Sequence, residues 1–359
     1  MKILHVTESL GAGVGHFLAL VTRGQVVAGH DVVLAHSIRA DTQVAELDAQ
    51  FKGVRRVVVS MVTEVSWVQD ALSVFRLVRL MRAVQPDVIH LHSSKAGVLG
   101  RVAARMCGVR AQVFYSPHGF AFLRQDVSSN KQKLFLWFEQ LAAKLGGNLV
   151  ACSRSEADLA RAQVHHPRVH LVENATDLSE IPLTTGSPHQ VKVINAGRVC
   201  YQKAPWQFRK VADACANLPA HFVWLGAGDL AAELQSAATK NLTLTGWLTR
   251  ADVAKHLADA DIFLMPSLWE GMPLALIEAQ AAGIPAVVSN VVGCKDVIED
   301  GVTGFVCDSE DGLAARTRQL IEDPLLRKRM GENAARIART RFSVGRMNDE
   351  ILRLYAAND

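Results

Sequence analysis

Two glutamates stand eight residues apart, Glu270 and Glu278, around a turn between a strand-like and a helix-like segment. The apolar run 261–266 precedes the turn, and the run 274–282 follows it. Gly271 leaves room for a ligand, and the N–H groups at a helix start favour anions. Two carboxylates around an anion site indicate recognition of hydroxyl groups beside a phosphate, which is the chemistry of a nucleotide sugar. The alternative is an amphipathic helix with two solvated glutamates.

Two cations, Arg198 and Lys203, follow the predicted strand 191–196 on one loop that opens with Gly197. They can converge on one anion, because arginine offers a planar fork and lysine a mobile point charge, a pair suited to a diphosphate. Ligands of such sheets bind at the carboxyl ends of the strands, so we expect this loop at the same edge as Glu270. The alternative is a pair of surface cations.

A glycine-rich segment, residues 11–15, separates the predicted strand 2–6 from a helix predicted to begin at His16. Its spacing differs from G-x-G-x-x-G, so it does not indicate a dinucleotide site. Gly13 is the candidate for close approach of the backbone to a ligand. A tight strand-to-helix turn explains the same residues equally well.

Histidines lie near the ends of two further predicted strands. His118 follows the strand 112–115 and precedes Gly119, which opens the backbone there. An imidazole in that position is a candidate for hydrogen-bonding a reacting group. His90, in the predicted strand 87–91, is interpreted as a core residue.

Short β-branched runs alternate with helical patterns, which is typical of doubly wound α/β structure. A polar stretch at 178–190, with Pro182, Gly186 and Pro188, is the predicted linker. We therefore expect two doubly wound domains with a cleft between them and ligands at the carboxyl ends of the strands. The tail 324–357 is predicted to be helical. The predicted strands are 2–6, 31–35, 87–91, 112–115, 149–151, 191–196, 222–225, 261–265 and 286–288.

The chain has 359 residues, 49% of them hydrophobic, which suits two buried cores. Its six cysteines are scattered without a C-x-x-C pair, which argues against a disulfide framework or a zinc site. No apolar run has the length of a signal-peptide core or a spanning helix, so we expect a cytoplasmic protein. Residues 1–180 hold 20 Lys and Arg against 15 Asp and Glu. This basic balance suits an anionic membrane surface or is ordinary surface charge, and no motif indicates nucleic acid.

Together these segments resemble the retaining glycosyltransferases of family four, which have the GT-B fold. Residues 270–278 match that family's E-x7-E motif, and Gly197, Arg198 and Lys203 match its phosphate-binding segment. The resemblance runs essentially from end to end and indicates the branch that builds capsules, exopolysaccharides and O-antigens. Further matching segments are 226–229, 246–247, 301–305, 11–16, 92–97, 117–120 and 341–355.

The chain departs from the family pattern at several uncharged positions. Ala204 follows Lys203 where a glycine is usual, Ala175 stands in place of another glycine, and Val344 replaces a frequent aromatic. No charged contact is lost, so the departures do not put activity in doubt. They do weigh against copying a donor preference from the family.

The resemblance implies a role for each matching residue. Arg198 and Lys203 would hold the diphosphate and stabilise the leaving nucleotide. Glu278 would accept hydrogen bonds from the ribose hydroxyls, and Glu270 would hold hydroxyls of the donor sugar. His118 would contact the donor sugar near the reacting carbon. Backbone groups and turns would complete the nucleotide site at Gly13, Gly197, Gly226, Gly228, Trp247, Gly271, Met272 and Leu274.

The resemblance therefore implies a retaining, metal-independent glycosyltransferase of the hexosyltransferase class. It would move a hexose or N-acetylhexosamine from a nucleotide sugar, with UDP as the expected nucleotide, to a polysaccharide or polyprenyl-linked glycan. No Asp-x-Asp pair follows a predicted strand, so we expect no metal or other cofactor. We expect front-face attack by the acceptor hydroxyl, because no carboxylate nucleophile is evident. The alternatives are a nucleotide-sugar epimerase of the same fold and a non-catalytic nucleotide-sugar-binding protein.

The resemblance divides the chain into an acceptor-side domain, residues 1–178, and a nucleotide-sugar-binding domain, residues 179–341. A closing helix, 342–359, would cross back onto the first domain. Two segments of the first domain, 75–84 and 130–145, carry basic residues beside apolar ones and can lie in a membrane interface. Core-facing helices with basic outer stripes have the same pattern, so peripheral contact with the inner membrane face is one of two open interpretations.

Overall fold

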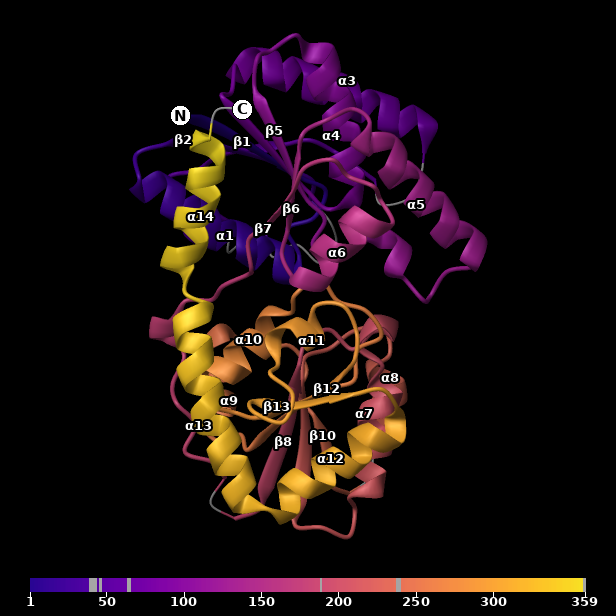
Figure 1. Cartoon of the computed structure of the whole chain (residues 1–359), viewed down its shortest axis with the longest axis vertical. Coiled ribbons are helices and arrows are strands. Elements are labelled where there is room, and N and C mark those ends of the chain that lie inside the picture. Colours follow the sequence, from indigo (N-terminus) through magenta and orange to yellow (C-terminus); the bar gives the residue numbers. More distant parts are fainter. Residues whose placement is uncertain (39–43, 45–46, 63–65, 188, 237–239, 358–359) are drawn as a thin grey trace. The chain divides into compact units, whose positions relative to one another are not determined.

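The structure is a computed structural model that describes residues 1–38, 44, 47–62, 66–187, 189–236 and 240–357. The chain divides into two compact units, one made of Met1–Asn174 and Val344–Asp359 and the other of Ala175–Ser343 (Figure 1). Residues 178–190, predicted as a linker, belong to the second unit. There Thr184 Oγ1 donates a hydrogen bond of 2.6 Å to the backbone oxygen of Ala260. Pro188 lies outside the described residues.

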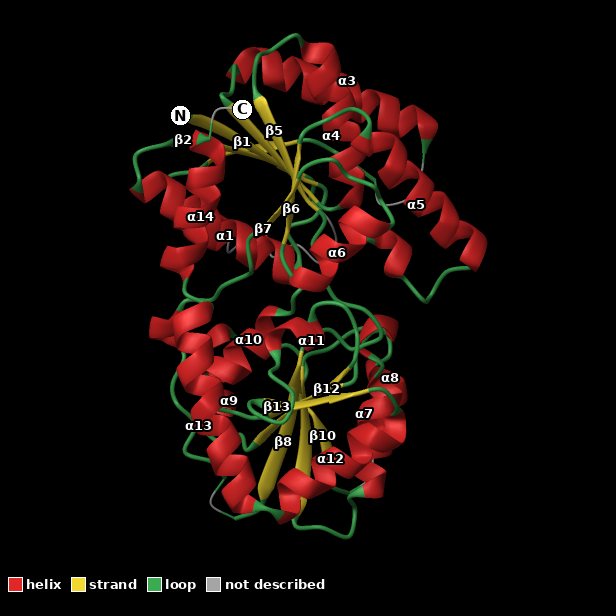
Figure 2. Ribbon diagram, in the orientation of Figure 1, coloured by secondary structure: helices red, strands yellow, loops and turns green. Residues whose placement is uncertain are grey.

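The first unit contains a parallel seven-stranded sheet with the order β3-β2-β1-β4-β5-β6-β7 (Figure 2). The order reverses between β1 and β4, so the carboxyl ends of these neighbours form a topological switch point, where ligands bind in such sheets. The strands are β1 (Lys2–Thr7), β2 (Asp31–His36), β3 (Arg55–Val58), β4 (Val88–His92), β5 (Gln112–Ser116), β6 (Asn148–Ala151) and β7 (Val169–Leu171). The helices are α1 (Ala12–Val27), α2 (Leu47–Gln50), α3 (Trp67–Val84), α4 (Ser94–Cys107), η2 (Ala121–Leu123), α5 (Ser129–Ala143), α6 (Arg154–Ala162) and α14 (Val344–Ala356).

Helix α1 begins at Ala12, earlier than the start predicted at His16. Gly11 is extended and precedes the helix, so Gly13 belongs to the first helical turn. Gly15 is the glycine that the packing requires, because a Cβ there would lie 2.1 Å from the backbone oxygen of Leu10. A Cβ on Gly13 would meet nothing within 4 Å. The glycine-rich segment therefore lets the helix start pack closely on the loop before it.

The second unit contains a parallel six-stranded sheet with the order β10-β9-β8-β11-β12-β13. Its switch point lies between β8 and β11, the strands that precede the candidate cations and glutamates. The strands are β8 (Val191–Ala196), β9 (Ala220–Leu225), β10 (Leu242–Leu244), β11 (Ile262–Met265), β12 (Ala286–Ser289) and β13 (Gly304–Cys307). The helices are η3 (Leu178–Glu180), η4 (Tyr201–Lys203), α7 (Pro205–Ala214), α8 (Ala231–Ser236), α9 (Arg250–Ala258), α10 (Leu274–Ala281), α11 (Cys294–Val297), α12 (Glu310–Glu322) and α13 (Pro324–Arg341).

The helical tail predicted for 324–357 is two helices, α13 and α14, interrupted at Phe342 and Ser343. Phe342 is buried, and its backbone oxygen accepts a hydrogen bond of 3.1 Å from the N–H of Thr176. This burial and backbone pairing favour a break over a continuous helix. Helix α14 then belongs to the first unit, where it packs against α1 and buries Tyr355. Residues 358–359 of the predicted closing helix lie outside the described residues.

Candidate active site

The central feature of the second unit is an ion pair between Lys203 and Glu270, whose Nζ and Oε1 atoms are 2.7 Å apart. Lys203 ends the turn η4 after β8, and Glu270 lies on the loop after β11, so adjacent strands deliver the two charges to one edge of the sheet. Both side chains are nearly buried, with 14% and 9% of their surface exposed. Burial opposes the charge of Lys203, but the Glu270 carboxylate outweighs it and raises the pKa of the lysine. Lys203 is therefore a fixed cation.

Two hydrogen bonds join the loops that carry this pair. Gln202 Nε2 donates to the backbone oxygen of Trp269 at 2.8 Å, and the N–H of Leu268 donates to the backbone oxygen of Gln202 at 2.8 Å. They involve residues next to Lys203 and Glu270 in sequence, so they fix the spacing of the two charges. Sequence reasoning missed Gln202, because its role depends on a loop that lies far away along the chain.

Three of the predicted glycines line the loops after β8 and β9, and each has a steric reason. Gly226 has φ 142°, and a Cβ there would lie 2.2 Å from the backbone oxygen of Gly197. A Cβ on Gly228 would lie 2.4 Å from the backbone oxygen of Val199 and 2.9 Å from the Cγ atom of Arg198. Gly197 itself has φ 143°, and a Cβ there would contact the Lys203 side chain. The loops thus pack backbone to backbone beside both cations.

Trp247, which is predicted to belong to the nucleotide site, lies on the loop after β10. Its side chain is 65% exposed. The preceding residue, Gly246, has φ 77° and forms an isolated β-bridge with Gly226. The bridge attaches the tryptophan loop to the glycine turn after β9, so these two predicted segments come together in space.

Glu278 lies one turn into α10, facing two residues that the sequence did not indicate. Its Oε1 accepts hydrogen bonds from Thr176 Oγ1 at 3.3 Å and from Arg250 Nη2 at 3.4 Å. Burial raises the pKa of the Glu278 carboxyl, and Arg250 opposes that shift. Both of these contacts are long, and a carboxylate offers about four acceptor positions, so Glu278 can also accept hydrogen bonds from a ligand's hydroxyl groups.

The turn from Gly271 to Leu274 is supported from behind by Gly293. Gly293 has φ 82°, and a Cβ there would lie 2.1 Å from the backbone oxygen of Gly271 and 3.0 Å from the N–H nitrogen of Met272. Pro273 precedes the first residue of α10 and contributes no side-chain cap. The first N–H groups of the helix therefore remain suited to an anion.

In the first unit, His118 stands at the end of β5 in a left-handed conformation with φ 56°. The next residue, Gly119, donates its N–H to Glu156 Oε1 at 2.6 Å, and Cys152 donates its N–H to Glu156 Oε2 at 2.8 Å. The buried Glu156 thus anchors the strained loop that carries His118. Burial lowers the pKa of His118 to about 4, so its imidazole is neutral near pH 7. The His118 ring meets the Phe17 ring edge to face, with centroids 4.6 Å apart.

Each unit therefore assembles its own share of the predicted residues. Gly197, Arg198, Lys203 and Glu270 adjoin one another in the second unit, while Glu278 is held by Thr176 and Arg250. The backbone of the predicted segment at 301–305 instead forms a turn and the start of β13. Three supporting residues, Gln202, Thr176 and Glu156, carry no local sequence signal because their partners are distant.

Comparisons with known proteins bear on the family of the chain. Residues 186–337 match the family described as glycosyl transferases group 1, and residues 11–180 match glycosyltransferase family 4. An Escherichia coli protein, UDP-Gal:alpha-D-GlcNAc-diphosphoundecaprenol alpha-1,3-galactosyltransferase, is 32% identical over 270 residues, which cover 69% of each chain. The chain belongs to the family 4 glycosyltransferases. The family resemblance of its motifs is thus confirmed, and the protein is an enzyme of this class.

Solved structures place the glycosyltransferase in the expected fold. Sucrose-phosphate synthase from Thermosynechococcus elongatus superposes with a TM-score of 0.82 at 18% identity, covering 99% of this chain and 98% of that one. Anabaena HepE, in complex with UDP and glucose, superposes with a TM-score of 0.79 at 20% identity and full coverage of both chains. The prediction of a GT-B fold built from two Rossmann-like domains is confirmed.

Proposed function

We propose that this glycosyltransferase transfers a hexose or N-acetylhexosamine from a UDP-sugar to a polysaccharide or lipid-linked glycan, with retention of configuration and without a metal ion. The observation that carries the proposal is the Lys203–Glu270 pair, a cation fixed beside a carboxylate at a switch point. The name of the E. coli relative, with UDP-Gal as donor and a diphosphoundecaprenol-linked acceptor, supports the same substrate classes.

In the proposed reaction, the bond between the anomeric carbon and the phosphate oxygen breaks, and its electron pair goes to the phosphate. The acceptor oxygen bonds the anomeric carbon from the same face, and its proton passes to the departing phosphate oxygen. Lys203 and Arg198 would stabilise the charge that builds on the diphosphate, and the start of α10 would add its N–H groups. Glu270 would hold sugar hydroxyls, and Glu278 would hold the ribose.

The placement of carboxylates favours charge stabilisation by side chains over a divalent ion. The Asp-x-Asp sequence of the second unit, Asp259 and Asp261, precedes β11 and thus lies at the opposite edge from Glu270. Asp259 pairs with Lys192 at 2.6 Å, and Asp261 lies 3.7 Å from Arg327. These aspartates are engaged in structural ion pairs, so we infer that Lys203 and Arg198 supply the positive charge.

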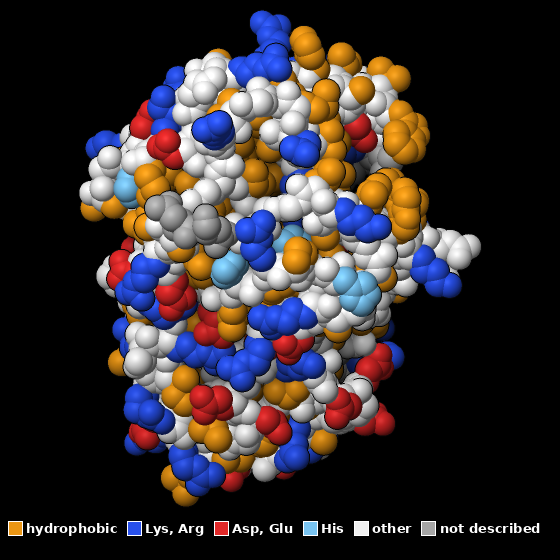
Figure 3. Space-filling model, turned by 45° about the horizontal axis from the view of Figure 1, so that its top comes forward, with side chains coloured by type: hydrophobic (Ala, Val, Ile, Leu, Met, Phe, Trp, Pro, Cys, Tyr) orange, Lys and Arg blue, Asp and Glu red, His pale blue; other side chains and the backbone are white. Residues whose placement is uncertain are grey.

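A lipid-linked acceptor would bring the enzyme to a membrane surface, and two helices of the first unit suit that role. Helix α5 exposes Leu134, Trp137 and Leu141 at spacings of three and four residues, beside Lys131 and Lys133. Helix α3 exposes apolar side chains at Trp67, Val68, Leu72 and Phe75. Both helices contact α4, and Figure 3 shows exposed hydrophobic and basic side chains together over the upper right of the molecule. We propose that this surface lies in the membrane interface.

Within the predicted segment 75–84, the apolar residues Leu77, Val78 and Met81 are buried against the core, whereas Phe75 is exposed. The exposed apolar side chains of α3 therefore lie in its first half and overlap the predicted segment only at Phe75. The spacing of apolar residues in the sequence does not indicate which side of α3 faces the core. Among the described residues, no helix is long and apolar enough to span a bilayer.

A thermal-shift series with UDP, GDP and ADP, each with and without EDTA, tests the donor site. A ligand at about 100 times its dissociation constant adds about 2.7 kcal/mol of stability. We expect UDP to raise the unfolding temperature equally with and without EDTA. Stabilisation by GDP or ADP alone would overturn the choice of UDP, and loss of the shift in EDTA would overturn metal independence.

A product assay tests the reaction itself. With UDP-galactose or UDP-N-acetylglucosamine and a lipid-diphosphate GlcNAc acceptor, we expect release of UDP and a glycan in which the anomeric configuration of the donor is kept. Interconversion of UDP-sugars in the absence of acceptor would instead indicate an epimerase. An inverted linkage would exclude front-face attack.

Vesicle sedimentation tests the membrane surface with two matched variants. Leu134→Ser changes the exposed stripe of α5, whereas Leu325→Ser changes an exposed leucine of α13 in the second unit. We expect only Leu134→Ser to reduce binding to vesicles that contain anionic lipid. Equal binding of the two variants would contradict the proposed surface.

A further inference from the structure

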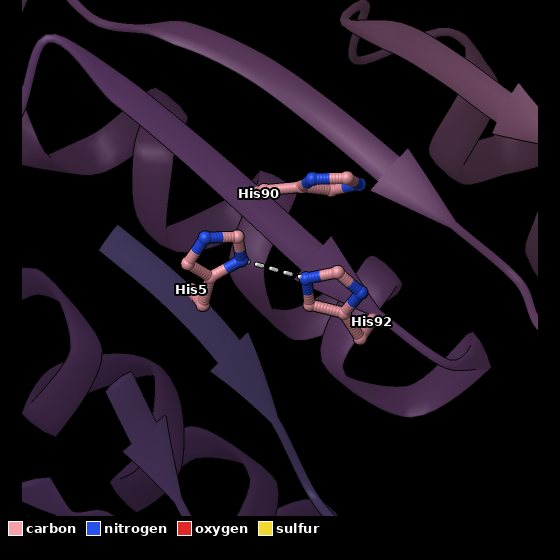
Figure 4. Close-up of side chains that lie close together, drawn as sticks. All are labelled: His5, His90 and His92. Carbon is pink, nitrogen blue, oxygen red and sulfur yellow. Dashed lines mark hydrogen bonds between the residues drawn. The ribbon is translucent and has the colours of Figure 1, made fainter. Parts of the chain in front are cut away.

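Four histidines, from β1, β4 and the loop after β5, lie next to one another, and three of them form one chain of hydrogen bonds. His5 Nε2 lies 2.8 Å from Gln25 Oε1, and His5 Nδ1 lies 2.9 Å from His92 Nε2. His92 Nδ1 in turn lies 3.0 Å from His118 Nε2. The chain therefore runs from Gln25 on α1 to His118, the histidine that the family resemblance places near the donor sugar. Figure 4 shows the central bond between His5 and His92, with His90 beside them.

Three of these residues, His5, His90 and His92, lie close enough to suggest a metal site, with one ligand atom of each within 4.8 Å of the others. However, every ring nitrogen of the three already has a hydrogen-bonding partner in the protein. His90 Nδ1 contacts the Tyr355 hydroxyl at 2.5 Å, and His90 Nε2 contacts Ser116 Oγ at 2.9 Å. A metal ion would have to replace these contacts, so the arrangement favours a proton-ordered chain over a metal centre.

Because each ring carries one proton, the hydrogen bonds of the chain must all be donated in the same direction. Burial lowers the pKa of each of the four histidines below its ordinary value, to about 4 for His5 and His118, so the rings are neutral near pH 7. A neutral imidazole has one N–H and one lone pair. Each bond holds one proton, so His5 and His92 must each donate on one side and accept on the other, and all three bonds point the same way. The group at the end of the chain decides which way.

In the structure Gln25 presents its amide oxygen, which can only accept, to His5, and the Nε2 of the same amide is buried without a hydrogen-bonding partner among the described residues. His5 must then donate from Nε2, which leaves its Nδ1 to accept from His92 Nε2. His92 Nδ1 accepts in the same manner from His118 Nε2. The proton of His118 is thus on Nε2, and its Nδ1, which bonds no described residue, carries a lone pair.

We propose that Gln25, acting through His5 and His92, is a positioning residue that holds His118 in the Nε2–H tautomer, so that His118 Nδ1 accepts a hydrogen bond from a hydroxyl of the bound sugar. The tautomer rests on the geometry of the first unit alone, whereas the nature of the ligand rests on the proposed function. The acceptor character of Nδ1 selects for a sugar with a free hydroxyl at the contacted position, and against a deoxy or O-methylated sugar there.

Nitrogen-detected NMR of protein labelled with ¹⁵N-histidine measures the tautomer directly, and His118→Asn assigns the signal by removing it. In the native protein we expect an unprotonated Nδ1 and a protonated Nε2 at His118. The opposite tautomer would overturn the proposal. The proposal would also fail if these signals were absent and elemental analysis found a metal bound by the histidines. This measurement needs no destabilised variant.

Gln25→Met removes the terminal acceptor while keeping side-chain length, and Thr22→Val is its matched control. Thr22 is also fully buried on α1, but its hydroxyl donates to the backbone oxygen of Leu18 and takes no part in the chain. We expect Gln25→Met to lower the ratio of Nε2–H to Nδ1–H tautomer at His118 about fivefold, the factor that about 1 kcal/mol for one hydrogen bond corresponds to. An equal tautomer ratio in both variants would overturn the role of Gln25.

Titration with two nucleotides separates this inference from the proposed function. UDP-galactose should shift the His118 Nδ1 signal, and UDP alone should not, although both stabilise the protein against heat. If UDP-galactose binds without moving the signal, the hydroxyl contact is wrong while the tautomer stands. If no nucleotide binds, the proposed donor site fails, and the NMR result in the free protein still decides the tautomer.

Discussion

Replacing Lys203 by methionine should destabilise the second unit strongly, because it leaves the Glu270 carboxylate nearly buried without its partner. Breaking a buried ion pair on one side costs about 3–5 kcal/mol. The lower end applies here, since 14% of the lysine and 9% of the glutamate side chain remain exposed. For a domain of the size of residues 175–343, 1 kcal/mol corresponds to about 2–4 °C. Lys203→Met should therefore lower the unfolding temperature by about 6–12 °C.

Lys210 provides a matched control for this prediction. Its Nζ also lies 2.7 Å from a carboxylate oxygen, that of Glu310, but the two side chains are 57% and 44% exposed. Exposed pairs contribute about 0–1 kcal/mol. Lys210→Met should thus shift the unfolding temperature by no more than about 4 °C. The comparison isolates burial, because residue type and distance are the same.

Differential scanning fluorimetry of both variants, and of Lys203→Met combined with Glu270→Gln, completes the test. The double variant should regain most of the lost stability, because a neutral amide no longer carries an unpaired buried charge. A loss for Lys203→Met no larger than that for Lys210→Met would refute the reasoning. So would a double variant less stable than either single one. UDP should also stabilise Lys203→Met less than it stabilises the native protein.

Three further predictions concern single residues. Burial raises the pKa of the Glu278 carboxyl above 4.5. The native state therefore binds the carboxyl proton more tightly than the unfolded chain does. The free energy of unfolding falls as the pH rises through the interval above 4.5. Glu278→Gln should flatten this part of the pH profile, measured by denaturant unfolding, and weaken UDP binding. Gly293→Ala should destabilise the protein more than Gly301→Ala. Both glycines have positive φ, but a Cβ at position 293 would lie 2.1 Å from a backbone atom, whereas a Cβ at position 301 would meet nothing within 4 Å. Equal melting temperatures would contradict a steric role for Gly293. Glu156→Gln replaces one of two accepting oxygens and should cost about 1–3 kcal/mol of stability. It should also slow transfer at unchanged UDP affinity, because Glu156 anchors the loop of His118 through the N–H of Gly119. Unchanged turnover would contradict that anchoring.

Local sequence patterns predicted much of the fold. All nine strands read from the sequence are present, because buried parallel strands are short continuous apolar runs bounded by turn residues. The strands missed, β3, β7, β10 and β13, have three or four residues each, and β3 and β7 contain no fully buried residue. Such segments become strands only when a neighbouring edge supplies hydrogen-bonding partners.

The candidate site was predictable where its residues follow strand ends. Glu270, Lys203 and Arg198 were identified because parallel strands deliver their following loops to one edge. Their supporting contacts were not predictable. Thr176 and Arg250 lie far along the chain from Glu278. Gln202 bonds the backbone of the loop that carries Glu270, and a backbone partner cannot be recognised from residue type.

The sequence by itself determined the family, the alternation of strands and helices, and the chemical types at the strand ends, because these depend on local spacing and on the period of apolar residues. Only the tertiary structure decided which polar groups meet. It brought Gln25, His5, His92 and His118 into one hydrogen-bonded chain and placed Tyr355 against His90 from the far end of the sequence. Hydrogen bonds form over about 3 Å. Residue spacing within one segment does not determine distances of that size to a segment far away along the chain.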